Sequence, residues 1–280
     1  MRYFTKEWYQ LCQKTDLHLF LEESKEAESF SEEYFQRVYD EELNKFLSLQ
    51  EEASSVSFDD LYPQEMEIEF LQDDLSAEEI QALKHHYAIE REEARESYIP
   101  PKSLDREEAI DQFTEAYFDN LKRSKTLLPT TILNEIADIR VFVLNRASRK
   151  VIEELKSFSE NNQKIVDDTI KDYKTYYKKT YGDSDPIGNI NFHDCTIAQA
   201  FQQKNEFTLI LDNSGGFTDI QSVTFTNCEI SLREMRLENA SWLYDEIYKN
   251  GENYELQVLL LSENSDLLYF TIRFEKVIFE

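Results

Sequence analysis

The chain has 280 residues and a net charge of −27, with 57 Asp and Glu against 30 Lys and Arg. Its 41% hydrophobic and 13% aromatic residues are too many for a disordered chain. Its length allows one large domain or two. A chain this acidic repels nucleic-acid phosphates and anionic membrane surfaces, so we expect neither as a partner.

The negative charge is concentrated in the N-terminal part of the sequence. Residues 1–120 carry 32 acidic against 11 basic side chains, residues 121–185 carry 10 against 13, and residues 186–280 carry 15 against 6. One interpretation is that acidic N-terminal helices pack beside basic central ones. The other is that an acidic face binds a basic protein partner. The charge distribution alone is consistent with both interpretations.

The cysteines and the apolar segments indicate a cytoplasmic protein. Cys12, Cys195 and Cys228 are odd in number and lack metal-ligand spacing, which favours a reducing compartment over a disulfide framework. The first residues contain no apolar stretch of the kind found in signal peptides. The longest apolar run near the end, residues 258–261, is too short to cross a membrane.

Helix-start signals recur through the first half of the chain. Predicted N-caps are Thr5, Ser29 or Ser31, Ser76 and Asp105. Glu79 and Glu108 lie three residues after the last two caps, the spacing of a capping box, in which the two side chains bond each other's backbone N–H groups. The helix after Ser76 is expected to end near Ser97, ahead of two prolines.

The longest helical pattern covers residues 130–181, which contain no glycine and no proline. Its apolar residues recur with the 3.6-residue period of a helix. One continuous helix would be about 78 Å long, whereas the radius of gyration of a compact chain of this length is only about 19 Å. We therefore predict a break between Asn145 and Ser148, because Asn and Ser side chains compete for backbone hydrogen bonds.

The C-terminal part is expected to be rich in strands. All five glycines lie at or after Gly182, and a run of turn-forming residues, 182–186, divides an acidic helical domain, 1–182, from a sheet domain, 186–280. Strands are predicted at 207–212, 219–230, 254–261 and 268–274, the first two forming a hairpin, with a short helix at 242–249. The fold class is therefore α+β: a helical N-terminal two-thirds, then a mainly antiparallel sheet with one or two short helices.

Three segments resemble a family of uncharacterised bacterial proteins. They are residues 2–9 (RYFTKEWY), residues 30–35 (FSEEYF) and residues 128–141, which include LP and IADIRV. The resemblance covers most of the chain and implies a soluble bacterial cytoplasmic protein. The family has no assigned activity, so the resemblance implies no catalytic residue.

His86 is a candidate metal ligand. On a helix it shares a face with Glu79, Glu90 and Glu93, at offsets of seven, four and seven residues, and His with carboxylates can ligate a divalent metal. A solvated helix rich in glutamate produces the same spacing by chance. Known phosphate-loop, hydrolase and zinc motifs are absent from the sequence. We assign no catalytic, cofactor-binding or metal-binding residue.

Two further candidate sites also have structural explanations. His193, Asp194 and Cys195 adjoin like a catalytic triad, but neighbours in a strand point to opposite faces, so Asp194 would point away from the other two. Cys195 is therefore expected to be a small buried residue. Arg140 lies on the apolar stripe, so we expect a buried ion pair with an acidic N-terminal side chain. The alternative is an anion-binding site.

The sequence favours a non-enzymatic protein-interaction or adaptor module. One alternative is a metal-dependent enzyme that uses the helix face around His86. Another is an acidic inhibitor or immunity-type protein that masks a basic partner.

Overall fold

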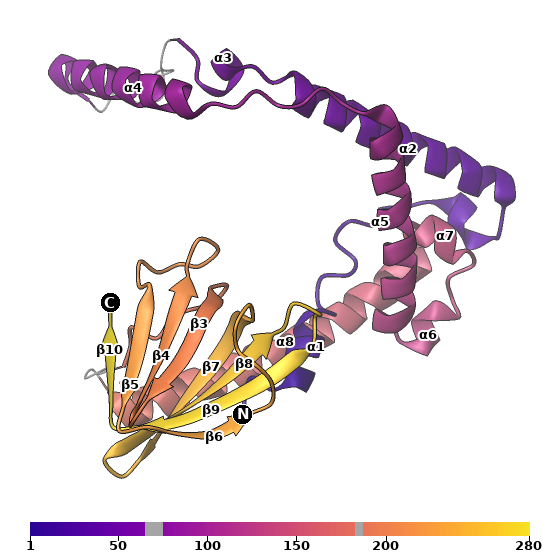
Figure 1. Cartoon of the computed structure of the whole chain (residues 1–280). Coiled ribbons are helices and arrows are strands. Elements are labelled where there is room, and N and C mark those ends of the chain that lie inside the picture. The colour runs from indigo at the N-terminus through magenta and orange to yellow at the C-terminus, as the bar shows by residue number, and fades with distance from the viewer. Residues whose placement is uncertain (65–74, 183–186) are drawn as a thin grey trace. The chain divides into compact units, whose positions relative to one another are not determined.

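The computed structural model describes residues 1–64, 75–182 and 187–280 (Figure 1). Its elements, in chain order, are α1 (Lys6–Cys12), β1 (Glu22–Glu23), η1 (Lys25–Glu28), α2 (Glu32–Ser55), α3 (Phe58–Leu61), α4 (Ala77–Ser97), α5 (Arg106–Leu127), α6 (Thr130–Leu133), α7 (Ile139–Phe142), β2 (Arg146–Ala147), α8 (Arg149–Tyr181), β3 (Thr196–Gln203), β4 (Glu206–Asp212), β5 (Ser222–Thr226), β6 (Glu229–Arg233), β7 (Ser241–Asn250), β8 (Asn253–Leu261), β9 (Leu267–Phe274) and β10 (Lys276–Phe279).

Contacts divide the chain into two compact units. One consists of Met1–Leu19 with Glu153–Glu280, and the other of Phe20–Ile152. Of the expected joint at 182–186, residues 183–186 lie outside the described residues. The division into domains 1–182 and 186–280 therefore stays a prediction.

The predicted helix starts are confirmed by their caps. The hydroxyls of Thr5 and Ser31 accept hydrogen bonds from the N–H groups three residues on. Ser76 and Glu79 form a complete capping box at the start of α4, which ends at Ser97 as predicted. Asp105 accepts from the N–H groups of Glu107 and Glu108, but the predicted capping box is incomplete there, since the Glu108 carboxylate accepts from Gln112 instead. These starts depend on local hydrogen bonds, which is why a few residues predict them.

The predicted break in the long central segment is also confirmed. Asn145 has a φ of +63°, residues 146–147 form β2, and the Ser148 hydroxyl accepts the N–H of Val151 at the start of α8. The 33 residues of α8 span about 50 Å. Residues 130–145, before the break, are less helical than their apolar spacing predicts. They form only the one-turn helices α6 and α7.

The unit formed by Phe20–Ile152 is built around α2, α5 and α7. Their buried side chains Tyr34, Val38, Tyr117 and Val141 meet in one apolar cluster with Leu144, which follows α7. The two-residue strands β1 and β2 pair in parallel and tie the residues before η1 to those before α8. Arg140 belongs to α7, one of the helices that meet in this cluster.

The other unit contains an eight-stranded antiparallel sheet in the order β10-β5-β4-β3-β7-β8-β9-β6. The predicted hairpin is confirmed as β4 and β5, and the two later predicted strands as β8 and β9. The predicted strand 219–230 is not continuous, because the chain turns at Asn227, with a φ of +47°, and Glu229 and Ile230 belong to β6. In β9 the residues predicted to be buried, at alternate positions from Leu268 to Phe274, are all buried. The alternation therefore identified the core-facing side of this strand.

The predicted helix at Trp242–Lys249 is wrong, because these residues belong to β7. β7 pairs along its length with β8, and its fully buried Trp242 lies in the sheet core. Gly251, with a φ of +65°, starts the two-residue turn between the strands rather than ending a helix. Pairing with β8 and burial in the core override the local signal. No short helix follows β3 in the described residues.

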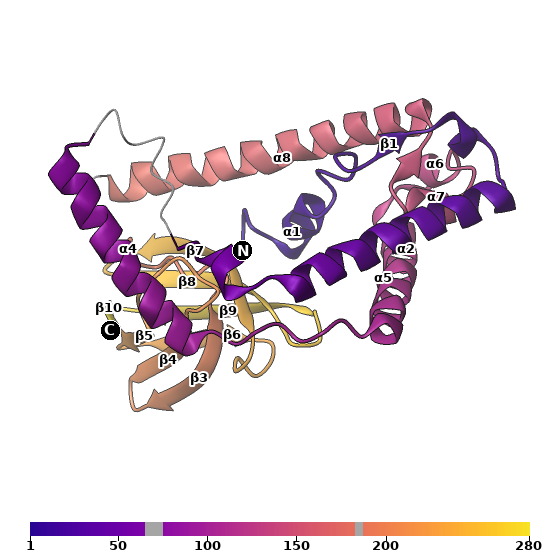
Figure 2. The same ribbon diagram turned by 90° about the horizontal axis from the view of Figure 1, so that it is seen from above.

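The sheet curls so that its two halves face each other. The rings of Phe225 on β5 and Phe274 on β9 lie 4.9 Å apart, and those of Phe207 on β4 and Phe270 on β9 lie 5.7 Å apart, although these strands are not neighbours in the sheet. β3 and β7 meet at the fold line and pair only at Thr196. Figure 2 shows α8 along one side of the sheet.

Candidate functional site

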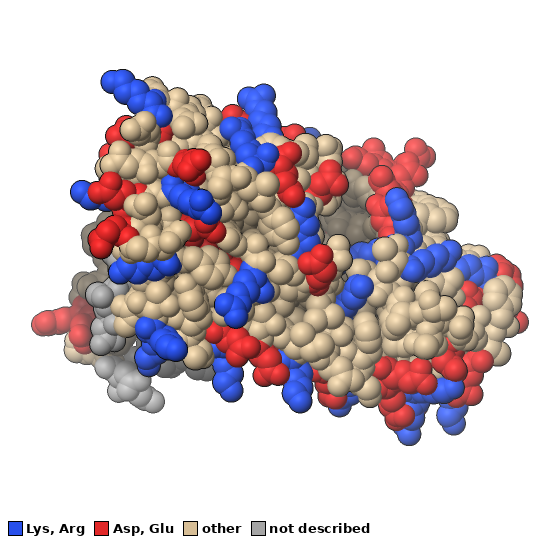
Figure 3. Space-filling model, turned by 90° about the horizontal axis from the view of Figure 1, so that it is seen from below, with Lys and Arg blue, Asp and Glu red and all other residues tan. Residues whose placement is uncertain are grey.

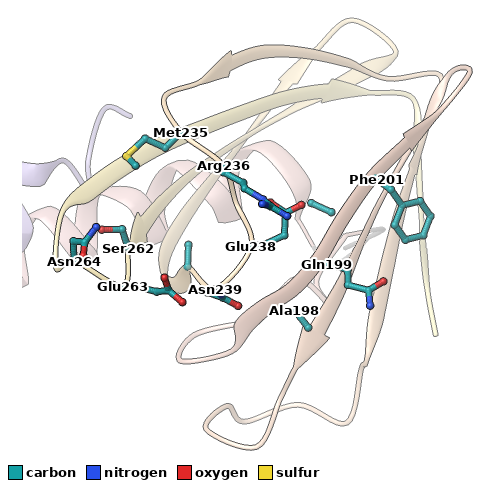
Figure 4. Close-up of a pocket in the computed structure, with 12 residues that line it drawn as sticks. Ala198, Gln199, Phe201, Met235, Arg236, Glu238, Asn239, Ser262, Glu263 and Asn264 are labelled. Atoms are coloured by element: carbon teal, nitrogen blue, oxygen red, sulfur yellow. The ribbon is translucent and has the colours of Figure 1, made fainter.

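A cleft opens where β3 and the chain before β7 diverge. Its volume is about 570 Å³. Residues 198–201 of β3 form one side, and residues from 235–240 and 262–264, which precede β7 and follow β8, form the other (Figure 4). Pockets that bind ligands typically have volumes of roughly 300–1,000 Å³. The size is therefore suitable for a small molecule or a short segment of polypeptide.

The side chains around the cleft combine small, apolar and charged groups. Phe201 and Met235 are 42% and 47% exposed. The guanidinium Nε of Arg236 donates to Glu238 at 3.0 Å, and this arginine contributes to a lowered pKa of the Glu238 carboxyl, after a local backbone hydrogen bond. Glu263 makes no ion pair with the described residues. The cleft thus presents one unneutralised carboxylate and two accessible apolar side chains.

A second group of polar side chains lies on β7, away from the cleft. Asp245 is partly buried, and its carboxylate accepts from the indole N–H of Trp242 at 3.0 Å. Burial raises the pKa of Asp245 to about 6, with a smaller contribution from neighbouring Glu246, while His193 acts in the opposite direction. A carboxyl that titrates near neutrality suits proton transfer, but the cleft residues do not include it.

Arg140 is paired as the sequence predicted. Its guanidinium donates to both carboxylate oxygens of Asp138 and, at 2.8 Å, to Glu32, an N-terminal acidic side chain. These hydrogen bonds, Asp138 first, raise the pKa of Arg140. The guanidinium also lies over the rings of Phe30 and Phe35. The side chain is 27% exposed rather than fully buried, so the ion pair lies at the edge of the cluster of α2, α5 and α7.

His86 lies on a largely exposed face of α4. Its Nε2 is 3.2 Å from a carboxylate oxygen of Glu90, and both side chains are more than half exposed. The Glu79 carboxylate is instead held by the backbone and hydroxyl of Ser76. Within the described part of the chain, no three His, Cys, Asp or Glu side chains converge as a metal site would require. The geometry around His86 is that of a single solvent-exposed ion pair.

His193 and Asp194 lie in a turn before β3, not in a strand as expected. Asp194 has a φ of +65°, and its carboxylate lies 3.6 Å from His193 Nε2. Cys195 is fully buried, as predicted, and burial raises the pKa of its thiol, which disfavours the reactive thiolate. Gly216 lies against it, and a Cβ there would be 2.4 Å from the Cys195 sulfur. The turn at 213–216 thus packs on the thiol.

Charged side chains of both signs are interspersed on the face drawn in Figure 3. The acidic excess is clearer on single elements. α4 carries six glutamates against three basic residues, and Arg91 is already paired with Asp59. Glu92, Glu93 and Glu96 form no ion pair with described residues. Their negative charge is available to a partner.

α4 is also incompletely covered by the rest of the described chain. The residues Ile80, Leu83, Tyr87, Ala94 and Tyr98 follow helical spacing and are half-buried, and α4 has no fully buried residue. Leu61, Ile89 and Ile99 nearby are 56%, 46% and 85% exposed. We call α4 with Leu61, Tyr62 and Ile99 the α4 surface. It combines apolar side chains with an acidic excess.

A family model described as a protein of unknown function (DUF4085) matches residues 102–272, more than half of the chain. The chain belongs to the DUF4085 family. No curated protein and no solved structure matches it. The DUF4085 match confirms the expected family of unknown function. It contains every residue that lines the cleft, and the α4 surface precedes it.

No pattern in the sequence predicted the cleft of this DUF4085 protein. Its walls come from three segments, 198–201, 235–240 and 262–264, that are far apart in the sequence, and none carries a recognisable motif. β3 was not predicted at all, although the uncharged run Gln199–Gln203 before a turn was the available signal. Among the described residues, no helix is both long enough and apolar enough to cross a membrane.

Proposed function

We propose that this DUF4085 protein is a cytoplasmic protein-interaction module that binds a basic partner through the α4 surface. The incomplete burial of α4 carries the proposal. Helices in proteins owe most of their stability to packing of an apolar face, yet the apolar face of this 21-residue helix is only half-covered by the described chain. Exposed apolar groups that lie together mark sites of protein contact.

The charge of the α4 surface supports a basic partner. Glu92, Glu93 and Glu96 are free of ion pairs with described residues, and such charges speed the encounter with a partner of opposite sign. A second copy of this chain carries the same net charge of −27 and would be repelled. Three free cysteines support a reducing compartment. An adaptor and an inhibitor that masks a basic surface both fit this mode of binding.

The test captures the partner and then measures the contribution of charge. A photo-crosslinking residue placed at Ile89 in the full chain should capture a basic protein, whereas the same residue at the exposed Phe118 of α5 should not. With the purified partner, Glu92→Lys combined with Glu96→Lys should weaken binding about tenfold, or ~1.4 kcal/mol.

The matched control makes the same charge change elsewhere. Glu115→Lys with Asp119→Lys, on exposed positions of α5, should weaken binding no more than about twofold. Equal effects of the two double variants would leave only the overall charge of the protein as the cause. An acidic captured protein, or equal capture from Phe118, would contradict the proposal.

A further inference from the structure

Among the residues that the structure describes, β3 has one paired edge and one open edge. It pairs with β4 through residue 203, but with β7 only at Thr196. In an antiparallel ladder, alternate residues direct their N–H and C=O groups to opposite neighbours. The register therefore turns the backbone groups of Ala200 and Gln202 away from β4 and toward the cleft.

The hydrogen bonds at the start of β3 fix this direction. The N–H of Ile197 donates to the carbonyl of Ala240 at 2.9 Å, and the N–H of Asn239 donates to the carbonyl of Ile197 at 2.8 Å. Asn239 has a φ of +65°, and the preceding residues leave the ladder. A β-bulge follows Ile197, so the next outward residue is Ala200. The ladder begins and then stops for lack of a partner strand.

Residues 199–203 of the open edge include no charged residue and no proline. Proteins commonly guard exposed edges with charged residues or proline, but residues 199–203 are Gln-Ala-Phe-Gln-Gln. The alanines at 198, 200 and 240 leave room for a backbone to approach. Another strand can form hydrogen bonds with every outward backbone group of this edge. A small molecule cannot do so along the whole edge.

The side chains at the cleft indicate what kind of segment fits. Phe201 and Met235 are among the residues that line the cleft, and both are partly exposed. Arg236 already neutralises Glu238, whereas Glu263 has no ion-pair partner among the described residues. A basic side chain on the incoming segment would pair with Glu263. The edge of a second copy is disfavoured by the shared charge of −27.

We propose that the open edge of β3 binds an extended polypeptide segment with a basic side chain, which joins the sheet as an additional strand beside residues 199–203. This site is independent of the α4 surface and does not rest on the function proposed above. The backbone of the segment exchanges hydrogen bonds with Ala200 and Gln202, and its basic side chain pairs with Glu263.

The test starts from a phage library of random nine-residue peptides, selected on the full chain. Peptides that contain Lys or Arg among β-branched or apolar residues should be enriched. Gln202→Pro removes one outward N–H without removing a bond to β4, and should weaken binding of a selected peptide at least about tenfold. Gln202→Ala keeps that N–H and should change the affinity less than about twofold.

A second measurement covers the case in which Gln202→Pro fails to fold. N-methylation of single backbone nitrogens along the peptide should weaken binding to the wild-type chain at every second position, because a strand directs alternate N–H groups to its neighbour. Equal sensitivity at all positions, or none, would overturn strand addition. A library that yields no peptide above the level of an unrelated acidic protein would also overturn it.

Reversing the charges of the peptide residue and of Glu263 tests the proposed ion pair between them. Changing the basic residue of the peptide to Glu should weaken binding about tenfold, and Glu263→Lys should restore it, whereas Glu252→Lys in the β7–β8 turn should not. Failure of the exchange would overturn the basic specificity. A dimer of the wild-type chain that Gln202→Pro dissociates would assign the edge to a second copy and overturn the proposal.

Discussion

The carboxylate of Glu246 accepts the backbone N–H of Phe4 at 2.6 Å, across 242 residues of sequence. Glu246 is fully buried, with 0% of its surface exposed to solvent. It also accepts the N–H groups of Arg2 and Tyr3, at 2.8 and 2.7 Å, and the hydroxyl of Tyr248. A buried charge on β7 thus holds the first residues of the chain on the sheet.

Glu246→Gln should destabilise the protein by about 2–4 kcal/mol, because an amide replaces a carboxylate that accepts several charge-assisted hydrogen bonds in a buried site. The amide N–H₂ would also face backbone N–H donors. Urea denaturation followed by circular dichroism measures the change in the free energy of unfolding.

Glu255→Gln, on neighbouring β8, is the control for Glu246. Glu255 pairs with Arg273, whose side chain is 53% exposed, so its replacement should cost less than about 1 kcal/mol. Deleting residues 1–4 should cost more than Glu246→Gln, because it also removes the buried ring of Phe4, and the two changes together should cost less than their sum. Additive losses would contradict the link between Glu246 and the N-terminal residues.

Arg140→Ala should cost about 2–3 kcal/mol, because Asp138, only 3% exposed, loses a two-point ion pair. The loss is smaller than for a fully buried pair, since Arg140 is 27% exposed and Glu32 is 67% exposed. Arg140→Lys should recover part of it, because an ammonium does not reproduce the bidentate contact. Urea midpoints of the variants measure both effects.

Arg37 provides the control for Arg140. Its ion pair with Glu26 is exposed on both sides, so Arg37→Ala should shift stability by no more than about 0.5–1 kcal/mol. An unchanged midpoint in Arg140→Ala would contradict the structural role of Arg140 and favour the anion-binding alternative.

Asp245 should make stability fall as pH rises through about 6. Its folded-state pKa is raised to about 6 from an ordinary 3.8, so the folded protein holds this proton more tightly than the unfolded chain. The stabilising contribution is complete below pH 3.8 and is lost by about pH 7, a change of about 3 kcal/mol. Unfolding free energies of wild type and Asp245→Asn, measured from pH 4 to pH 7, isolate this group.

Asp212 provides a control of opposite sign for Asp245. Hydrogen bonds from Ser214 lower the pKa of the exposed Asp212, so its contribution is present at neutral pH and is lost as pH falls through that lowered pKa. The free energies of unfolding of Asp212→Asn and wild type should therefore differ most above pH 3.8, the ordinary pKa of an aspartate. If wild type and Asp245→Asn have parallel pH profiles, the raised pKa of Asp245 is contradicted.

Zinc, nickel and manganese should raise the melting temperature of wild type and His86→Ala by the same small amount. Glu79 is engaged by Ser76, and His86 has Glu90 as its neighbouring carboxylate, so the ions meet only a generally acidic surface. Differential scanning fluorimetry with each metal measures the shift. A rise that disappears in His86→Ala would restore the metal-dependent alternative, because selective binding to the folded state raises its stability.

Limited proteolysis should distinguish two possible divisions of the chain. Division into 1–182 and 186–280 predicts cleavage within about five residues of Asp183, as expected of a turn-forming joint. Division by contacts predicts early chymotrypsin cleavage at the exposed Leu19 and Phe20. Mass spectrometry of the first fragments gives the answer. A first cut within 160–175, away from the second contact boundary at 152–153, would contradict both.

Local signals in the sequence determined the helices and several strands. Ser76 with Glu79 predicted both the start and the cap of α4, and Asn145 marked the break before α8. Alternation from Leu268 to Phe274 identified β9 and its buried face. These features depend on residues within a few positions of each other, so a short window contains the forces that produce them. The pairing of Arg140 with an N-terminal carboxylate followed from the cost of an unpaired charge.

Only the tertiary structure decided the features that join distant segments. Trp242–Lys249 became β7 because β8 and the sheet core lie beside it, which its own residues do not encode. The contact of Glu246 with Phe4, the open edge of β3 and the cleft all arise where chain segments far apart in sequence meet or diverge. Such contacts form only after the loops between them close, so no local pattern determines them.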